Sequence, residues 1–277
     1  MYSRSSTFTC CFFIIISALF TQCTRGKYAE TDKVYKRLAR DYSKTIRSAP
    51  AENQSVDSLD IGKQHWVGTV NFGIRRPNFV IIHHTAQDST AQTLLTFTIT
   101  STQVSAHYVV GRDGSVYQMV NDYLRAQHAG ESRWGNNSDL NSSSIGIELD
   151  NNGNEPYSDA QVVSLCAVLE TLKRKYKIPA ANFIGHADIA PTRKPDPNNF
   201  PWKTLAGQGY GLWYDELLET PPIDFDPVIA LRIIGYDVRN VEAAAVAFKR
   251  HFIQTDISPV LTDYDRSVLY NLYRKYI

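Results

Sequence analysis

Short apolar runs bounded by turn residues mark several expected strands along the chain. Residues 78–83 form such a run, which follows Pro77 and enters a pair of consecutive histidines, as is typical of a buried strand. Residues 107–120 contain two alternating segments on either side of Arg112-Asp113-Gly114, so we predict a β-hairpin with a glycine in its turn. Two further short strands are expected at residues 144–149 and 182–185.

Helical periodicity is clearest over residues 158–176. Ser158 and Gln161 form the pattern of a capping box, and Pro179 predicts the end of the helix. Residues 90–101 are also predicted to be helical, although their many threonines disfavour a helix. The expected apolar face of the longer helix consists of Val162, Leu165, Cys166, Leu169, Leu172 and Tyr176.

The order of these elements predicts an α/β fold in which helices cover a β-sheet, because each apolar sheet face needs a second layer. This domain is expected to span residues 61–219. The composition changes at Thr220-Pro221-Pro222, and a small helical domain is expected over residues 220–277. Its three predicted helices cover residues 227–234, 240–251 and 263–276.

The N-terminus has the pattern of an export signal. Residues 10–20 are apolar but shorter than the roughly 20 residues that span a bilayer. We therefore predict a secretory signal peptide over residues 1–22. Cys23 follows directly and favours a lipoprotein, in which this cysteine carries the lipid; a plain secreted protein is the alternative. Residues 23–60 are polar and charged, with some helical spacing over residues 28–42, and are predicted to form a tether.

The charge and the cysteine content of the chain argue against a nucleic-acid-binding protein and against a disulfide-rich or cysteine-based zinc protein. The chain has 29 basic and 28 acidic residues, so its net charge of +1 gives no sign of a nucleic-acid partner, which would call for a concentrated basic patch. Its four cysteines form neither a disulfide framework nor a CxxC metal motif. Cys166 is expected to be a small core residue.

Two histidine-bearing segments carry the candidate chemistry. His186 and Asp196 lie ten positions apart in a proline-rich stretch, and His83 and His84 end the first apolar strand. Two histidines and one carboxylate are the ligand set of a catalytic zinc ion with an open fourth position. Neighbours in a strand point to opposite faces, so one of His83 and His84 faces the metal, and their spacing does not say which. The prolines that would stiffen the second segment are Pro191, Pro195 and Pro197.

Two further side chains fit a hydrolytic site. Glu148 ends an apolar strand that has no structural need for a carboxylate, so it is a candidate general base; a solvent-facing charge is the alternative. Lys194 lies two residues before Asp196 and is a candidate to stabilise an oxyanion; an ordinary solvated loop lysine is the alternative.

Five motifs in order resemble a known family over about residues 65–205: FVIIHHTA, VSAHYVVGRDGSVYQMV, QHAG, NSSSIGIELDN and GHADIAPTRKPDPNNFPW. They are similar to the zinc-dependent N-acetylmuramoyl-L-alanine amidases, which are related to phage-lysozyme amidases and peptidoglycan recognition proteins. The last motif is the most specific. The resemblance implies the zinc amidase fold, a mixed central β-sheet flanked by helices. Residues 220–277 resemble the small three-helix peptidoglycan-binding module of the lipoprotein subgroup.

The resemblance assigns a role to each candidate. It implies that His83 is the first zinc ligand, with His84 in a variable position, and that the other ligands are His186 and Asp196. It places the general base on Glu148 and the transition-state lysine on Lys194. His107 and His128 fall on motif positions near the cleft, where substrate contact, support of the site and a purely structural role are all open.

Two positions depart from the family pattern. Asn198 stands where glycine usually follows Asp-Pro, and asparagine tolerates the left-handed backbone conformation that such a turn can need. Gln127 stands where tryptophan often precedes His-Ala-Gly, which puts a contact at the substrate edge in doubt.

The resulting expectation is a zinc hydrolase that cleaves the amide between N-acetylmuramic acid and L-alanine in peptidoglycan or muropeptides, in cell-wall turnover. The alternative is a non-catalytic peptidoglycan-binding protein, against which the complete ligand set and Glu148 argue. A zinc peptidase acting within the stem peptide is a third possibility. The resemblance, with the signal and Cys23, further implies a lipoprotein held at the outer membrane and facing the periplasm.

Overall fold

A computed structural model describes residues 26–47 and 69–277 of the chain. It divides into two compact units, Met1–Val70 and Asn71–Ile277, which are described separately. The predicted signal peptide over residues 1–22, the lipid site at Cys23 and the expected domain start at residue 61 lie outside the described residues. Within the described ranges, the helices are all too short or too polar to span a bilayer.

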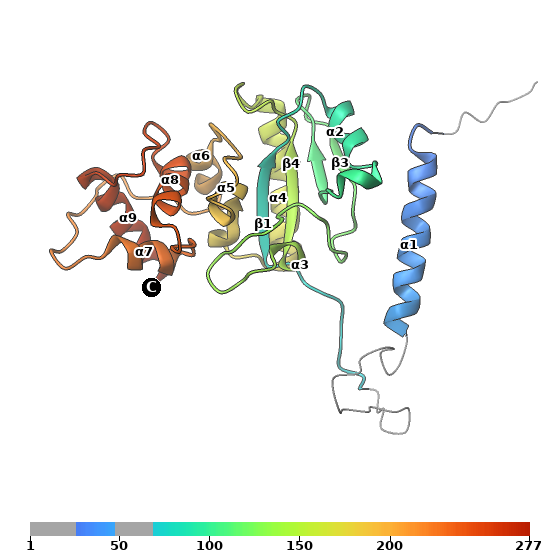
Figure 1. The fold of residues 1–277 in the computed structure, drawn as a ribbon, viewed down its shortest axis with the longest axis horizontal. Coiled ribbons are helices and arrows are strands. Elements are labelled where there is room, and N and C mark those ends of the chain that lie inside the picture. The colour runs from blue at the N-terminus through green and yellow to red at the C-terminus, as the bar shows by residue number, and fades with distance from the viewer. Residues whose placement is uncertain (1–25, 48–68) are drawn as a thin grey trace, which may run out of the picture. The chain divides into compact units, whose positions relative to one another are not determined.

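The first unit contributes one described helix, α1 (Ala29–Arg47; Figure 1). The sequence indicated helical spacing over residues 28–42, and the helix extends five residues further. Acidic residues occupy its first turn and basic residues its last, which complements the helix dipole. All its described side chains are at least partly exposed.

The second unit is built on a five-stranded sheet with the order β3-β2-β4-β1-β5. Strands β2, β4, β1 and β5 run parallel, and β3 pairs antiparallel with β2 at the edge, so the expected mixed sheet is confirmed. The predicted hairpin is β2–β3, with Gly114 at a φ of 83° in its turn. The strands are β1 (Phe79–His84), β2 (Tyr108–Val110), β3 (Val116–Gln118), β4 (Ser144–Leu149) and β5 (Phe183–Gly185).

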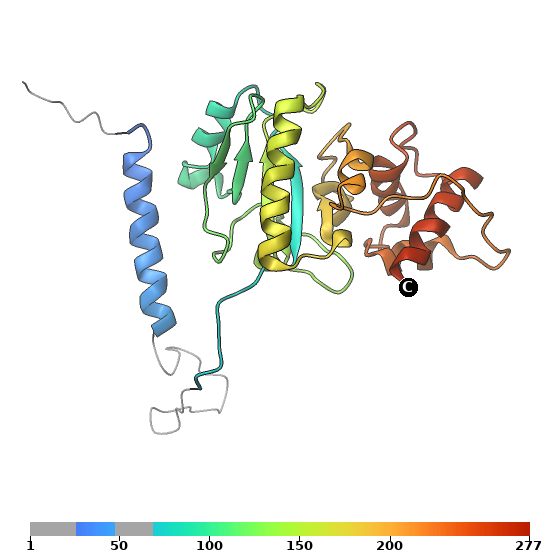
Figure 2. The same cartoon turned by 180° about the vertical axis from the view of Figure 1, so that it is seen from behind.

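One face of the sheet is covered by α4 (Asp159–Tyr176), which runs alongside β1 in front of the sheet in Figure 2. Leu165, Leu169, Leu172 and Tyr176 of its predicted apolar face are buried, and Val162 and Cys166 are partly buried against the same core. The Ser158 side chain accepts a hydrogen bond from the Gln161 N–H, as expected of a helix cap. The Gln161 side chain does not complete a capping box; it donates to the carbonyls of Val110 and Asp150.

The segment predicted as a helix over residues 90–101 is shorter in the structure. Helix α2 (Thr90–Thr96) ends early, and a 3₁₀ turn, η2 (Thr100–Thr102), follows it. Threonine hydroxyls of this stretch donate to carbonyls three or four residues earlier, as Thr96 does to Gln92 and Thr98 to Leu95. Such local bonds and β-branched side chains weaken a continuous helix.

The opposite face of the sheet packs against the C-terminal helical module, which we define as α7 (Pro227–Ile234), α8 (Val241–Phe252) and α9 (Asp263–Tyr276). All three helices were predicted within a residue of these bounds. Leu231, Phe248 and Leu269 of the module share one hydrophobic core with Ile81 of β1 and Ile184 of β5. Its independence as a domain stays a prediction. The remaining short elements are α3 (Leu140–Ser143), η3 (Ala180–Asn182), α5 (His186–Ile189) and α6 (Trp202–Gly207).

Candidate metal centre

The candidate site lies at the carboxyl ends of the parallel strands. His83 near the end of β1 is the register partner of Glu148 in β4, so the two side chains leave the same face of the sheet. Strand β5 pairs with the other side of β1 and leads directly into His186. Open α/β sheets bind ligands at this edge because the loops there converge.

Three potential ligand atoms converge at this edge. His83 Nδ1 lies 2.9 Å from His186 Nδ1 and 3.3 Å from Asp196 Oδ2, and His186 Nδ1 lies 3.1 Å from the same oxygen. All three side chains are buried, and together they form a group that could hold a metal ion. Bonds of about 2.0–2.1 Å to a tetrahedral zinc ion separate ligand atoms by about 3.3 Å. The donor set therefore fits zinc in both chemistry and spacing.

The protonation of these groups also suits a metal. Burial, followed by the nearby His186, lowers the pKa of His83 to about 4, so its imidazole is neutral at pH 7. Burial opposes ionisation of Asp196, but hydrogen bonds with His186 and His83 outweigh it and hold its pKa well below the usual range. Neutral imidazole and ionised carboxylate are the forms that bind metal.

His84 has a different environment from His83. It points to the opposite face of β1, and its Nδ1 accepts a hydrogen bond from the Asn198 N–H at 3.1 Å. Burial lowers the pKa of His84, which keeps this acceptor nitrogen available. His84 thus binds the backbone of the loop at Asn198, two residues beyond Asp196. His83, in contrast, belongs to the group of candidate metal ligands. The left-handed backbone conformation in this loop falls on Asn199, with a φ of 48°, so Asn198 does not need the conformational tolerance of asparagine.

Glu148 stands beside the cluster with an unsatisfied carboxylate. Its Oε2 is buried and has no hydrogen-bond partner among the described residues. Burial, with a contribution from the Asp196 carboxylate, raises the pKa of Glu148 to about 8, and Lys194 acts in the opposite direction. Lys194 itself is exposed on the loop that carries Asp196. Without a metal ion the carboxyl group is therefore largely protonated at pH 7, and its ionised form is a stronger base than an ordinary glutamate.

His128 and His107 lie behind the ligands. His128 Nδ1 is 3.1 Å from His83 Nε2, and its Nε2 is 3.2 Å from Ser144 Oγ. Its ring lies so close over Gly146 that a Cβ there would be 2.3 Å from the ring. His107 is fully buried, and its Nδ1 accepts the Gly146 N–H. These contacts favour support of the site for His128 and a structural role for His107.

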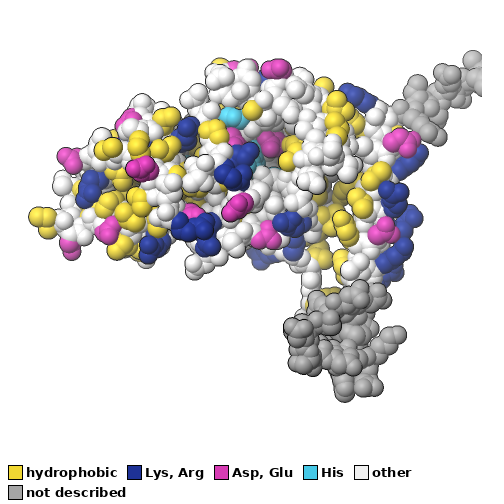
Figure 3. Space-filling model, in the orientation of Figure 1, with side chains coloured by type: hydrophobic (Ala, Val, Ile, Leu, Met, Phe, Trp, Pro, Cys, Tyr) yellow, Lys and Arg dark blue, Asp and Glu magenta, His cyan; other side chains and the backbone are white. Residues whose placement is uncertain are grey.

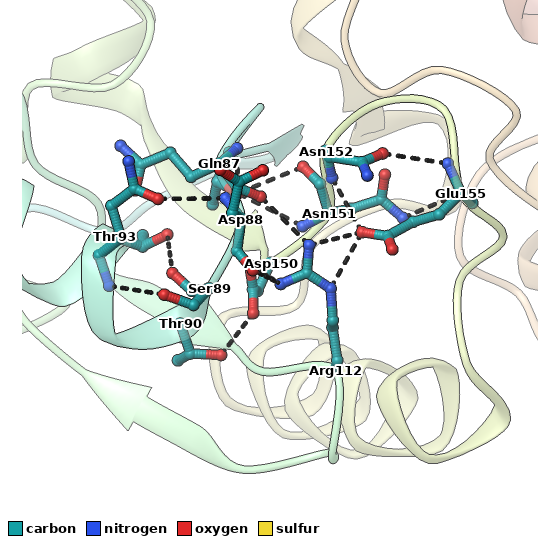
Figure 4. A network of polar contacts seen from close by, with 12 residues as sticks. Gln87, Asp88, Ser89, Thr90, Thr93, Arg112, Asp150, Asn151, Asn152 and Glu155 are labelled. Carbon is teal, nitrogen blue, oxygen red and sulfur yellow. Dashed lines mark hydrogen bonds and ion pairs between the residues drawn. The ribbon is translucent and has the colours of Figure 1, made fainter.

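A polar network ties together the loops beside the site (Figure 4). Arg112 from the β2–β3 turn pairs with Asp150 at 2.7 Å and with Glu155 at 2.5 Å, both after β4. Thr90, after β1, donates to Asp150 at 2.6 Å. The sequence pattern places Arg112 only in the turn of the hairpin. Its ion pairs with Asp150 and Glu155 join residues far apart in the chain, so no local sequence pattern predicts them.

The surface view shows histidine and acidic side chains gathered in a hollow, with basic side chains at its edge (Figure 3). Gln127, at the position where the family often has tryptophan, is exposed, and its Oε1 accepts a hydrogen bond from Arg125. Its backbone N–H donates to Ser105 Oγ. The side chain therefore presents a polar group to solvent in place of an aromatic ring.

The chain is similar to proteins of known activity. The family profile described as N-acetylmuramoyl-L-alanine amidase matches residues 74–199. The chain is 34% identical over 213 residues to N-acetylmuramoyl-L-alanine amidase AmiD of Escherichia coli, covering 65% of this chain and 76% of AmiD. It is 46% identical over 100 residues to 1,6-anhydro-N-acetylmuramyl-L-alanine amidase AmpD of Enterobacter cloacae, covering 36% of this chain and about half of AmpD, 54%.

Two solved structures have the same fold over most of their length. E. coli AmiD, in complex with anhydro-N-acetylmuramic acid-L-Ala-D-gamma-Glu-L-Lys, superposes with a TM-score of 0.66 at 31% identity, covering 76% of this chain and 93% of AmiD. AmpDh3 of Pseudomonas aeruginosa, in complex with anhydromuramic pentapeptide, gives 0.67 at 28% identity, covering 79% of this chain and 99% of AmpDh3. The chain belongs to the N-acetylmuramoyl-L-alanine amidase family.

Proposed function

We propose that this family member is a zinc hydrolase that cleaves the amide between the lactyl group of N-acetylmuramic acid and L-alanine in peptidoglycan or muropeptides. The observation that carries the proposal is the convergence of His83 Nδ1, His186 Nδ1 and Asp196 Oδ2 beside the unsatisfied carboxylate of Glu148. AmiD and AmpDh3, which share the fold, have been solved with muropeptide ligands.

The residues of the chain divide the chemistry among them. When bound, zinc supplies a Lewis acid for the scissile carbonyl and lowers the pKa of a water molecule. Glu148 accepts the proton of the attacking water and delivers it to the departing nitrogen of L-alanine. The Lys194 ammonium stabilises the negative charge that forms on the carbonyl oxygen. His128, whose Nδ1 lies 3.1 Å from His83 Nε2, would hold the His83 ring with its Nδ1 facing His186 and Asp196, where zinc would bind.

Purified protein is expected to contain one zinc ion per chain and to release an intact stem peptide that begins with L-alanine. Because the ligands must hold zinc for turnover, a chelator should abolish the release and added zinc should restore it. Mass spectrometry of the products from both sacculi and anhydro-muropeptides checks this. Absence of turnover by the zinc-loaded protein would favour a peptidoglycan-binding protein, and cleavage within the stem peptide would favour a peptidase.

We also propose that the mature chain is a lipoprotein anchored through Cys23 at the outer membrane, on the periplasmic side. The apolar run before Cys23 and the tether after it support this proposal. The Cys23→Ser variant is expected to move from the membrane fraction to the soluble fraction, because it cannot carry the lipid. Immunoblotting of fractionated cells measures this, and a variant that stays with the membrane contradicts the lipid anchor.

A further inference from the structure

The loop that carries two of the three candidate ligands is held partly by side chains of the C-terminal helical module. This loop, residues 185–200, begins at the end of β5, forms α5 at His186 and passes through Asp196. Within the loop, the Ala187 N–H donates to the Asp196 carbonyl at 2.7 Å, and the N–H groups of Ala190 and Lys194 close short turns on the carbonyls of His186 and Ala190. The module contacts it at two separate points.

The first point is Asp188, which lies in the turn that begins at His186. Its buried carboxylate accepts the Gly185 N–H at 2.7 Å, the Tyr236 hydroxyl at 2.8 Å, and lies 2.8 Å from His251 Nδ1. Two of these three partners belong to the module or its α7–α8 connection. A buried carboxylate that loses partners destabilises the conformation that buries it. Tyr236 and His251 therefore hold the short turn that begins at His186.

The second point is Asn198, the residue that stands where the family usually has glycine. Its Oδ1 accepts a hydrogen bond from Arg250 Nη1 of α8 at 3.0 Å, and its N–H is the group that bonds to His84. Glycine has no side chain with which to make the contact to Arg250. The departure from the family pattern thus adds a link between α8 and the loop two residues beyond Asp196.

Further contacts between the region of α8 and the chain at the end of the loop support the contacts at Asp188 and Asn198. The ring of Trp202 stacks on His251 with centroids 3.9 Å apart, and Gln254 donates to the Phe200 carbonyl at 2.7 Å. Arg250 and His251 are consecutive in α8, so one short segment of this helix contacts the loop close to His186 and close to Asp196. The same helix, α8, therefore contacts the loop near both candidate ligands, His186 and Asp196, and can fix the distance between them.

We propose that Tyr236, His251 and Arg250 are positioning residues for the metal centre, so that the C-terminal helical module is a structural part of this centre. The inference rests on the proposed function for the identity of the ion. It extends that function, because it assigns the module a role that does not depend on glycan binding. It also gives Asn198 a function specific to this chain.

The test uses substitutions that remove single contacts in the full-length protein. Tyr236→Phe removes one hydroxyl from Asp188, and Arg250→Ala removes the partner of Asn198. Matched controls are Tyr264→Phe and Arg232→Ala, which alter the same residue types on exposed parts of the module. Zinc affinity is measured by competition with a chromophoric chelator, and thermal unfolding of the metal-free protein is measured in parallel.

Each test variant is expected to bind zinc about 10- to 100-fold more weakly than wild type, as is typical when a group that orients a metal ligand is lost. The controls should bind zinc as wild type does. Asn198→Gly should lower zinc affinity as much as Arg250→Ala does. The variant that carries both substitutions should bind zinc no more weakly than either single variant. Arg250→Lys should bind zinc more tightly than Arg250→Ala. Unchanged zinc affinity in both test variants, or additive losses in the double variant, would overturn the proposal.

Zinc affinity also separates this proposal from the proposed function. If wild-type protein binds zinc but cleaves no muropeptide, the amidase proposal fails while the affinities of the variants still decide the role of the module. If a variant loses zinc affinity and unfolds at a much lower temperature without metal, general destabilisation explains the loss and the positioning role is rejected for that residue.

Discussion

The Glu148→Gln protein is expected to lose amide hydrolysis while keeping one zinc ion per chain. Glutamine has nearly the same shape as glutamate but cannot accept a proton at neutral pH. Since a positioned general base typically contributes about 10²- to 10⁴-fold to a rate, kcat should fall by a factor in that range. Single-turnover assays with a muropeptide, together with metal analysis of the same samples, measure both quantities. Turnover within threefold of wild type would remove Glu148 from the mechanism.

The same variant has a second expected property that excludes misfolding as the cause. Burial raises the pKa of Glu148 from 4.5 to about 8 in the folded protein. A folded-state pKa above the unfolded value means that metal-free wild type loses stability as the pH rises from about 4.5 to about 8. The glutamine variant lacks this loss, so its metal-free form should unfold at a higher temperature than wild type at pH 8. The two unfolding temperatures should converge as the pH falls toward 4.5.

His83→Ala is expected to lose zinc and turnover, whereas His84→Ala should retain stoichiometric zinc. The reason is that His83 Nδ1 faces His186 and Asp196, while His84 Nδ1 accepts the N–H of Asn198. Loss of a direct ligand should weaken zinc binding by more than about 100-fold, and loss of an orienting contact by about 10-fold. Chelator competition on the two purified variants compares these effects.

The opposite ranking, with the larger loss in His84→Ala, would contradict the assignment of the ligand to His83. Equal losses of zinc affinity in the two variants would mean that each substitution disturbs strand β1, and that neither removes a specific ligand. Circular dichroism of both variants is the control, since each histidine is buried near the end of β1 and its removal leaves a small cavity.

Local sequence patterns were sufficient for most of the sheet. The strand at residues 144–149 has the predicted bounds, because an apolar run between polar neighbours has few other stable environments. The three C-terminal helices were also predicted closely, and in the structure the side chains of Asp226 and Thr262 cap two of them. Helix α2 was predicted too long because the pattern did not show that threonine hydroxyls would bond to the local backbone.

The candidate site was predicted in composition but not in geometry. The motif around His186 and Asp196, together with the resemblance, was enough to name the expected ligands and base. Asp188 was in the same motif but was not singled out, because its partners Tyr236 and His251 lie 48 and 63 residues further along the chain. The local sequence around an aspartate in a short turn does not show whether its carboxylate is exposed to solvent or buried with hydrogen-bond partners.

By itself, then, the sequence determined the kinds of element, the family and the candidate zinc ligands and base, since these depend on local periodicity and on specific short motifs. The tertiary structure decided the rest. It brought His83, His186 and Asp196 close enough to share one ion and placed His128 behind them. It also joined the C-terminal module to the loop through Asp188 and Asn198. Those contacts join residues far apart in the chain, and they arise from the register of parallel strands and from a core shared between the sheet and the module.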